Sequence, residues 1–440
     1  MGPMKRLRPV WIAIGIGALT LGAKDLAVHV AEQYELAVIT RRTEALKAEF
    51  YAQDFTRPVL RGSPQPGNAW DHYIRAMREV EAEDKFNNVY VNLLSDYNLS
   101  RPTANPSAVA QILTKHASVL DHIRKGVQCG MARYPYHWSL HHIRPGVRFG
   151  DADFPTDWEK DWDYWNPEFK QSRINALSLA LAKRLRENGK EMEAAELMLD
   201  MCMYSRDQQH DNLRPDSGIA GSLLDVIHDI LISGRLSKAE LERLDRELGV
   251  LIEAFANPAL AHWNNLLGRG MYIRKEARYG RQMRFCQSGD KELTAGWRDF
   301  HSYKLMNSRA FHLLDGWTRT LASAENEPWE IAQRLLSGVR EEVEHAGPEM
   351  EMLSEVSAGG LTNRRRDAAK LRILRVAIHF LVAKEKLSIA DPFGSGPLKL
   401  ECGEKLKVWS LGWYGPVPSG RGSWRGYYGE NLALELPVNR

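Results

Sequence analysis

Residues 176–198 read ALSLALAKRLRENGKEMEAAELM, and this stretch decides the fold. Leucine and alanine recur through residues 176–182 and return over residues 194–198, with the spacing of two helical faces. Between them, Asn188 and Gly189 provide the left-handed residue that commonly ends a helix. Small residues on both sides let two paired helices approach closely. The stretch therefore predicts a helical hairpin.

A second hairpin signal follows, and its turn glycine lies 45 residues after the first (234 − 189 = 45). An apolar helical pattern over residues 223–232 ends at Gly234, and Ser237 with Glu240 is typical of a capping box that opens a helix to residue 255. The spacing resembles that of tetratricopeptide-like or HEAT-like arrays. An ordinary helical bundle is the alternative.

Other start signals predict helices elsewhere in the chain. Asn68 is a candidate N-cap, and Pro106 follows a second candidate, Asn105. Three arginines, residues 364–366, open another helical pattern and are read as a solvated helix start, with an anion or lipid-headgroup site as the alternative. Helices are expected over residues 69–83, 108–126, 328–344 and 364–385.

The N-terminus carries the pattern of a membrane signal anchor. Basic residues at positions 5, 6 and 8 precede an uncharged run over residues 9–23, and an apolar extension brings the span to residues 9–31. This pattern predicts contact with the inner membrane through residues 9–31, a cytoplasmic N-terminus and a periplasmic body. Cleavage of the leader, giving a secreted form, and a buried N-terminal helix of a cytosolic protein are the alternatives.

Changes of composition divide the chain into four parts. A membrane anchor and juxtamembrane helix would occupy residues 1–50, and a proline-rich linker residues 51–67. The helical body would run over residues 68–388, and a β-rich tail over residues 389–440. The expected fold is mainly α, with an N-terminal anchor helix, an irregular helical-hairpin body and a small antiparallel β tail.

The tail alternates apolar and polar residues over residues 398–402, 405–412 and 432–436, which predicts three strands. Its turns carry two motifs, Asp391-Pro392-Phe393-Gly394 and Trp409-Ser410-Leu411-Gly412. Their order resembles the C-terminal β region of type II secretion major pseudopilins. Similar tails occur on membrane-anchored helical bacterial proteins of unknown function, and the chain resembles that group more closely. It has no prepilin-peptidase site, and no acidic residue between Gly412 and Glu430 to hold the calcium ion that pseudopilins bind.

One loop, residues 134–165, gathers the residue types that bind or transform ligands. Imidazoles and carboxylates are metal ligands, and aromatic rings flanked by carboxylates often hold sugars. The spacing matches neither a zinc-protease helix nor an EF-hand, so no metal or other cofactor is predicted. Packing of the rings onto the body is the competing interpretation. The candidate binding residues are His137, Trp138, His141, His142, Asp151, Asp153, Trp158, Trp162 and Trp165.

Composition excludes several classes of protein. The net charge of +3 is too small, and too evenly spread, to predict nucleic-acid binding. The chain has no nucleophile elbow, phosphate-binding loop or dinucleotide fingerprint. None of the four cysteines, Cys129, Cys202, Cys286 and Cys402, belongs to a C-x-x-C pair, so two disulfides or four free thiols are both open.

These patterns favour a non-enzymatic, membrane-tethered, extracytoplasmic scaffold or interaction protein with a protein partner. A cell-envelope hydrolase, or a protein that binds cell-wall glycan, is the first alternative and would use residues 134–165. A component of secretion or pilus assembly is the second. Catalytic residues and an enzymatic activity are not assigned by any motif.

Overall fold

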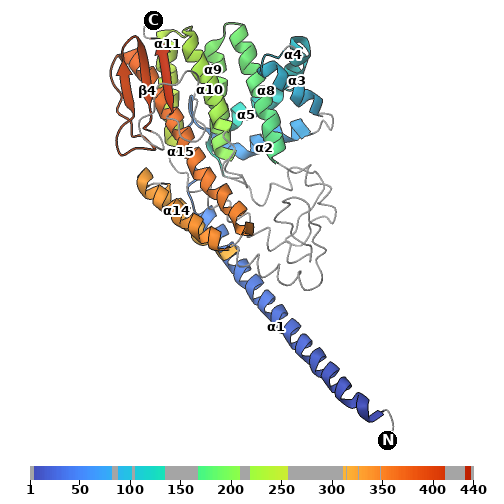
Figure 1. The fold of residues 1–440 in the computed structure, drawn as a ribbon. Helices are drawn as coiled ribbons and strands as arrows, with labels where there is room; N and C mark the ends of the chain where they lie inside the picture. The colour runs from blue at the N-terminus through green and yellow to red at the C-terminus, as the bar shows by residue number, and fades with distance from the viewer. Residues whose placement is uncertain are drawn as a thin grey trace.

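Helices make up most of the fold, and one small antiparallel sheet lies near the C-terminus (Figure 1). The computed structural model describes residues 4–81, 88–101, 105–133, 167–208, 219–255, 311–313, 315–325, 327–346, 348–411 and 432–437. The prediction of a mainly α fold with a small antiparallel β tail is confirmed. The helices are α1 (Met4–Tyr51), α2 (Ala69–Glu81), α3 (Asn88–Asn98), α4 (Pro106–Lys115), α5 (Ala117–Val127), α8 (Pro167–Glu187), α9 (Glu191–Gln208), α10 (Ile219–Ser233), α11 (Lys238–Ala254), α14 (Trp329–Ala346) and α15 (Pro348–Ala383). The strands are β1 (Gln65–Asn68), β2 (Cys129–Met131), β3 (Lys399–Cys402), β4 (Lys405–Trp409) and β5 (Ala433–Pro437).

Helices α8 and α9 form the first predicted hairpin. Gly189 has a φ of +73°, and the Lys190 amide donates to the Leu185 carbonyl at 2.9 Å. This left-handed turn ends α8 and reverses the chain. Every residue of α9 from Leu197 to Gln208 is buried, so this part of the helix is surrounded on all sides. A helix in that position must find a partner for each polar side chain that it carries.

Helices α10 and α11 form the second hairpin, around Gly234 at φ +69°. The Ser237 hydroxyl accepts from the Glu240 amide at 3.3 Å, and the Glu240 carboxylate accepts from the Ser237 amide at 2.7 Å. This is the capping box that the sequence predicts. Helix α10 packs against α9, and α11 packs against α15.

Two of the other helices differ from their predicted bounds. The segment expected as one helix over residues 108–126 breaks at His116, whose φ of −106° and ψ of +22° leave the helical region. Asn105 does cap α4, accepting from the Ala108 amide at 3.1 Å. The helix expected to open at Arg364 begins sixteen residues earlier, at Pro348 (364 − 348 = 16).

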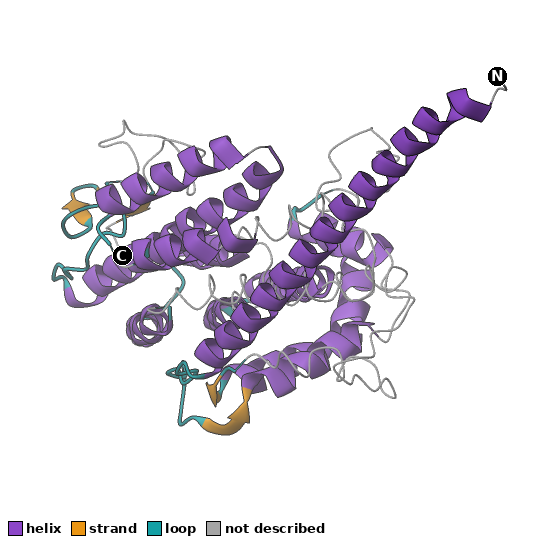
Figure 2. Ribbon diagram, turned by 90° about the horizontal axis from the view of Figure 1, so that it is seen from below, coloured by secondary structure: helices purple, strands orange, loops and turns teal. Residues whose placement is uncertain are grey.

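Helix α1 is 48 residues long, and its N-terminal part projects away from the rest of the fold (Figure 1, Figure 2). No helix in the described part of the chain is long and apolar enough to cross a membrane. The predicted signal anchor over residues 9–31, and with it the single-pass inner-membrane location, is therefore wrong. The uncharged run over residues 9–23 is about 22 Å of helix, against a hydrocarbon core of about 30 Å, and Lys24 ends it.

The chain between α1 and α2 follows the surface of the helical body. Strand β1 pairs in parallel with β2, which directly follows α5. The Arg57 amide donates to the Gly130 carbonyl at 2.9 Å, and the Ala132 amide donates to the Phe55 carbonyl at 3.1 Å. These backbone contacts hold a proline-rich segment, predicted as a linker, in one path.

The C-terminal sheet has the strand order β3–β4–β5, with all pairs antiparallel. Leu406 lies opposite Leu436 and Val408 opposite Leu434, and all four side chains are buried. This apolar face covers α15 and the end of α10. The sheet thus packs on the outside of the helical body, against α15 and α10.

A single carboxylate joins the two tail motifs. Asp391 accepts from the Phe393 amide at 3.0 Å, the Ser410 hydroxyl at 2.6 Å and the Leu411 amide at 2.7 Å. A Cβ on Gly394 would lie 3.1 Å from the same carboxylate, so a larger residue would crowd it. The motif Asp391 to Gly394 with Ser410-Leu411 is therefore a structural clamp between a turn and the end of β4.

We expect Asp391→Ala to lower the free energy of unfolding by about 2 kcal/mol, because it leaves buried donors without an acceptor. Thermal unfolding and limited proteolysis of the tail would measure the loss. Glu401→Ala, which removes an exposed carboxylate from β3, is the matched control and should change stability by less than about 0.5 kcal/mol. Equal effects of the two substitutions would contradict the clamp.

Candidate functional site

In the described residues, the candidate site is centred on a buried ion pair between Arg57 and Asp207. Arg57 comes from the segment after α1, and Asp207 from the buried C-terminal turn of α9. The Arg57 guanidinium donates to the Asp207 carboxylate from Nε at 3.1 Å and from Nη2 at 2.9 Å. Both side chains are fully buried. The two residues are 150 positions apart in the chain, so this pair fixes a long-range contact.

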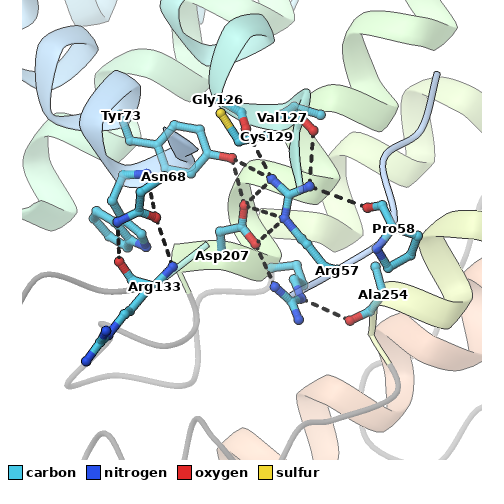
Figure 3. A network of polar contacts seen from close by, with 12 residues as sticks. Arg57, Pro58, Asn68, Tyr73, Gly126, Val127, Cys129, Arg133, Asp207 and Ala254 are labelled. Atoms are coloured by element: carbon cyan, nitrogen blue, oxygen red, sulfur yellow. Dashed lines mark hydrogen bonds and ion pairs between the residues drawn. The ribbon is translucent and has the colours of Figure 1, made fainter. Parts of the chain in front are cut away.

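Further partners complete the site (Figure 3). The Tyr73 hydroxyl of α2 donates to Asp207 at 2.7 Å, and Arg206 donates to the same carboxylate at 2.8 Å. Arg57 also donates to the carbonyls of Val127 at 3.0 Å and Gly126 at 3.2 Å, at the end of α5. Both carbonyls belong to the last turn of α5, so the guanidinium helps to cap the C-terminal end of this helix.

Gly126 is required by this geometry. A Cβ at that position would lie 2.3 Å from the Tyr73 ring and 3.1 Å from the Ala69 carbonyl. Only glycine lets α5 approach α2 closely enough for the Tyr73 hydroxyl to reach Asp207. Tyr73 also contacts Tyr204 of α9 edge-to-face, with ring centroids 4.9 Å apart.

The charges at the site determine what chemistry it can perform. Burial would raise the pKa of the Asp207 carboxyl, but Arg57 and Arg206 outweigh it and hold that pKa below its ordinary value. Burial, reinforced by Asp207, raises the pKa of Tyr73 well above its ordinary value. Burial would lower the pKa of Arg57, but Asp207 raises it above its ordinary value. Asp207, Tyr73 and Arg57 therefore each keep one protonation state near neutral pH. Such groups are suited to holding segments of the chain together rather than to proton transfer, and we call this site the latch.

A second arginine of the same segment repeats the arrangement nearer the surface. Arg61 donates to Glu247 of α11 at 2.5 Å and also pairs with Asp200 of α9. Arg243 donates to Glu247 at 3.0 Å from the preceding turn of α11. The segment after α1 is thus bound to α9 at two positions, Asp200 and Asp207, which are about two helical turns apart.

A second buried polar cluster lies where α15 packs against α10. Its centre is Asp367, which is 3% exposed. Lys370 donates to Asp225 of α10 at 3.1 Å, and Cys202 of α9 is close enough to interact with the Asp367 charge. Burial raises the pKa of Asp367 to about 7, although Lys370 and Arg366 oppose the shift. A carboxyl with such a pKa is a candidate acid or base.

The surroundings of Asp367 limit that role. Burial raises the pKa of the Cys202 thiol, which keeps it protonated and inert. Burial also lowers the pKa of His228, against the opposing effect of Asp229 and Asp225, so its imidazole is neutral near pH 7. The described residues thus place no activated nucleophile beside Asp367.

The arginine run, residues 364–366, is neither a solvated helix start nor an anion site in its first two members. Arg364 pairs with Glu325 at 2.7 Å, and both are buried. Arg365 donates to the carbonyls of Ala324 and Glu327 at 2.7 Å and of Pro392 at 2.8 Å. Its guanidinium also lies 5.2 Å from the centre of the Trp329 ring. Arg365 therefore fastens the chain before α14 to the tail turn.

The sequence-predicted binding residues lie outside the described residues. This holds for the whole set: His137, Trp138, His141, His142, Asp151, Asp153, Trp158, Trp162 and Trp165. In the part of the chain that the structure covers, no group of three or more His, Cys, Asp or Glu side chains is arranged to hold a metal ion. Cys129, Cys202 and Cys402 are free thiols, and Cys286 is outside the described ranges.

The residues of the latch were not singled out as a site in the sequence. Asp207 follows an apolar helical run, residues 197–204, but its immediate neighbours are polar, so its burial is evident only in the structure. No family model, curated protein or solved structure matches this chain. The resemblance of the tail to pseudopilins and to membrane-anchored helical proteins therefore stays a prediction.

We expect Arg57→Met to lower the free energy of unfolding by about 3–5 kcal/mol, because it removes the main partner of a buried carboxylate. Urea unfolding followed by circular dichroism would measure the loss. Arg101→Met is the matched control: it removes an ion pair with Asp96 whose arginine is 59% exposed, and should cost less than about 1 kcal/mol. In the double variant with Asp207→Asn, additive losses would contradict the latch.

We expect Asp367→Asn to stabilise the protein above pH 7 and to have little effect at pH 4. The folded pKa of about 7 lies above the ordinary value of 3.8, so folding favours the protonated acid, and stability falls as pH rises from about 4 to 7. In the variant the free energy of unfolding should not decrease over this pH range, a difference of roughly 2–4 kcal/mol from the wild type at pH 7. Melting temperatures across pH 4–8 would show this, with Asp121→Asn on an exposed face as the control. Parallel pH profiles for wild type and Asp367→Asn would refute it.

Proposed function

We propose that this chain is a non-enzymatic scaffold or interaction protein, in which the helical body holds α1 as a projecting arm for a protein partner. One observation carries the proposal. Leu26, Val30 and Tyr34 are exposed to 64%, 58% and 67% on the part of α1 that leaves the body. Their spacing of four residues places them along one stripe of the helix. Large apolar side chains grouped in this way are typical of interaction surfaces.

The exposed stripe lies on the face of α1 that points away from the body. The side that packs on the body is marked by four buried residues: Glu32, Ile39, Thr43 and Leu46. At about 100° per residue, these four lie roughly half a turn from Val30. The body therefore cannot cover the stripe without detaching the helix. A partner that binds there leaves the fold intact.

The base of the arm is firmly held. Arg42 donates to Asp315 through two nitrogens, at 2.8 Å and 3.0 Å, and Glu35 lies 3.0 Å from the His312 imidazole. Six residues after α1 ends, Arg57 enters the buried latch with Asp207. The direction of the arm is thus set from both sides of its attachment, as a rigid scaffold requires.

The chemistry of the buried polar groups supports the same proposal. The groups of the latch keep one protonation state near neutral pH, and each of them ties separate segments together. The described residues near Asp367 include a protonated thiol and a neutral imidazole rather than an activated nucleophile. The polar interior of the described fold therefore serves position rather than reaction.

The proposal predicts site-specific capture of a protein at the stripe. A photo-crosslinking amino acid at Tyr34 in the full chain should give protein adducts in cells, because that side chain points away from the body. The same group at Lys24, which is exposed on another face of α1, should give at least fivefold fewer. Mass spectrometry would identify the adducts. Absence of adducts at Tyr34, or equal yields at both positions, would overturn the proposal.

A further inference from the structure

We infer that the partner of the α1 stripe is a second copy of this chain, and that two α1 arms pair in a parallel coiled coil. This inference rests on the proposed function, because it names the partner for the same surface. It is drawn from the spacing of apolar residues along α1, from the face on which they lie, and from one polar residue within the stripe.

The spacing is that of a coiled-coil seam. Steps of four and three residues alternate through Ile12, Ile16, Leu19, Ala23, Leu26 and Val30. This is the a/d repeat of two helices that wind around each other. Of these positions, Leu26 (d) and Val30 (a) belong to the exposed stripe. The next d position is Gln33, and Tyr34 follows it and flanks the seam. The repeat then meets Gln33, Ala37 and Thr40, so the seam loses apolar character where α1 reaches the body.

Over residues 24–34 the stripe is narrow, which favours a helix over a lipid surface as its partner there. Lys24 and His29 are exposed on other faces of the same turns as Leu26. A bilayer would surround all of these faces, whereas a second helix covers only one. Gly22 and Ala27 flank the seam with small side chains, and a Cβ at Gly22 would meet nothing within 4 Å. Two helices can therefore approach closely there.

The position of the body permits the pairing. The body packs on the side of α1 marked by Ile39 and Thr43, and the seam is on the opposite side. Two copies related by a two-fold axis along the seam would carry their bodies on the outside of the coil. Among the described residues, the exposure of Leu26 and Val30 shows that the seam side of α1 is uncovered.

Gln33 decides the orientation. It occupies a d position of the repeat, and it is exposed in the single chain. In a parallel pair, the two Gln33 amides face each other and can exchange hydrogen bonds across the seam. In an antiparallel pair, each amide would face an apolar position of the partner helix and be buried without a hydrogen bond, which is costly. The parallel arrangement is therefore the one that the sequence of the seam supports.

Sedimentation equilibrium of the full chain should give a mass of twice 50.0 kDa at micromolar concentration. Leu26→Glu with Val30→Glu places four carboxylates in the seam of a dimer and should weaken association roughly 100-fold. Val28→Glu with Ala31→Glu adds the same charges on other faces and should leave the dimer unchanged. Circular dichroism would confirm that both double variants keep their helices.

Disulfide trapping tests the orientation. With Cys286→Ser and Cys402→Ser as background, Leu26→Cys should form a covalent dimer under mild oxidation, because a parallel seam brings the two positions together. Val28→Cys should not, since it points away from the seam. Trapping at both positions equally, or at neither, would overturn the parallel coil.

Other outcomes separate this inference from the proposed function. A monomeric wild type that cross-links at Tyr34 to a different protein would overturn the coil and leave the scaffold function standing. A monomeric wild type that binds phosphatidylethanolamine–phosphatidylglycerol vesicles through the stripe would overturn the coil in favour of a lipid surface. Absence of any cross-link at Tyr34 would overturn both.

Discussion

The ion pair between Arg57 and Asp207 is the constraint on which the path of the chain depends. From Leu197 onward helix α9 is buried on all sides, and Asp207 places a carboxylate in its last turn. A buried charge without a partner is too costly to keep, so a cation must come from another segment. Arg57 provides it, and this contact determines where the segment between α1 and α2 lies. The pairing of β1 with β2 and the entry into α2 follow from that position. Such a pair contributes specificity of fold more than net stability.

The same arrangement recurs at two other places in the described residues where irregular chain meets the helical body. Arg365 donates hydrogen bonds to carbonyls of the turn before α14 and of the tail. Asp391 accepts hydrogen bonds from donors in the tail turn and at the end of β4. In each case one buried charged side chain satisfies backbone groups that no helix or strand pairs. Loops have few apolar residues to bury, so these clamps supply the interactions that hold them. The regular elements are placed by apolar packing, and the segments between them by single charged residues.

The parts that sequence reasoning predicted are those with local signals. Gly189, Gly234 and the Ser237 capping box act within a few residues, and the alternation of the tail strands needs no distant partner. The early start of α15 was missed because Thr362 is a typical helix-capping residue, whereas the helix runs through it. The latch was missed because Arg57 and Asp207 are 150 residues apart, and no local sequence pattern predicts that the two side chains pair. The membrane anchor was wrong because the uncharged run, about 22 Å of helix, is shorter than the hydrocarbon core of about 30 Å, and a longer span must include Lys24.

An apolar stripe on a helix is ambiguous in sequence, since lipid and protein partners select the same residue types. The structure adds two facts that the sequence lacks: which face the body occupies, and which side chains remain in water. On α1 the body occupies the face opposite Val30, and charged or polar residues such as Lys24 stay exposed on the flanks. A surface that needs cover on one side only matches a second helix. Because Arg42 and Arg57 hold the base of α1, pairing of two arms would also fix the two bodies relative to each other. In this way the buried latch and the exposed stripe become parts of one scaffold.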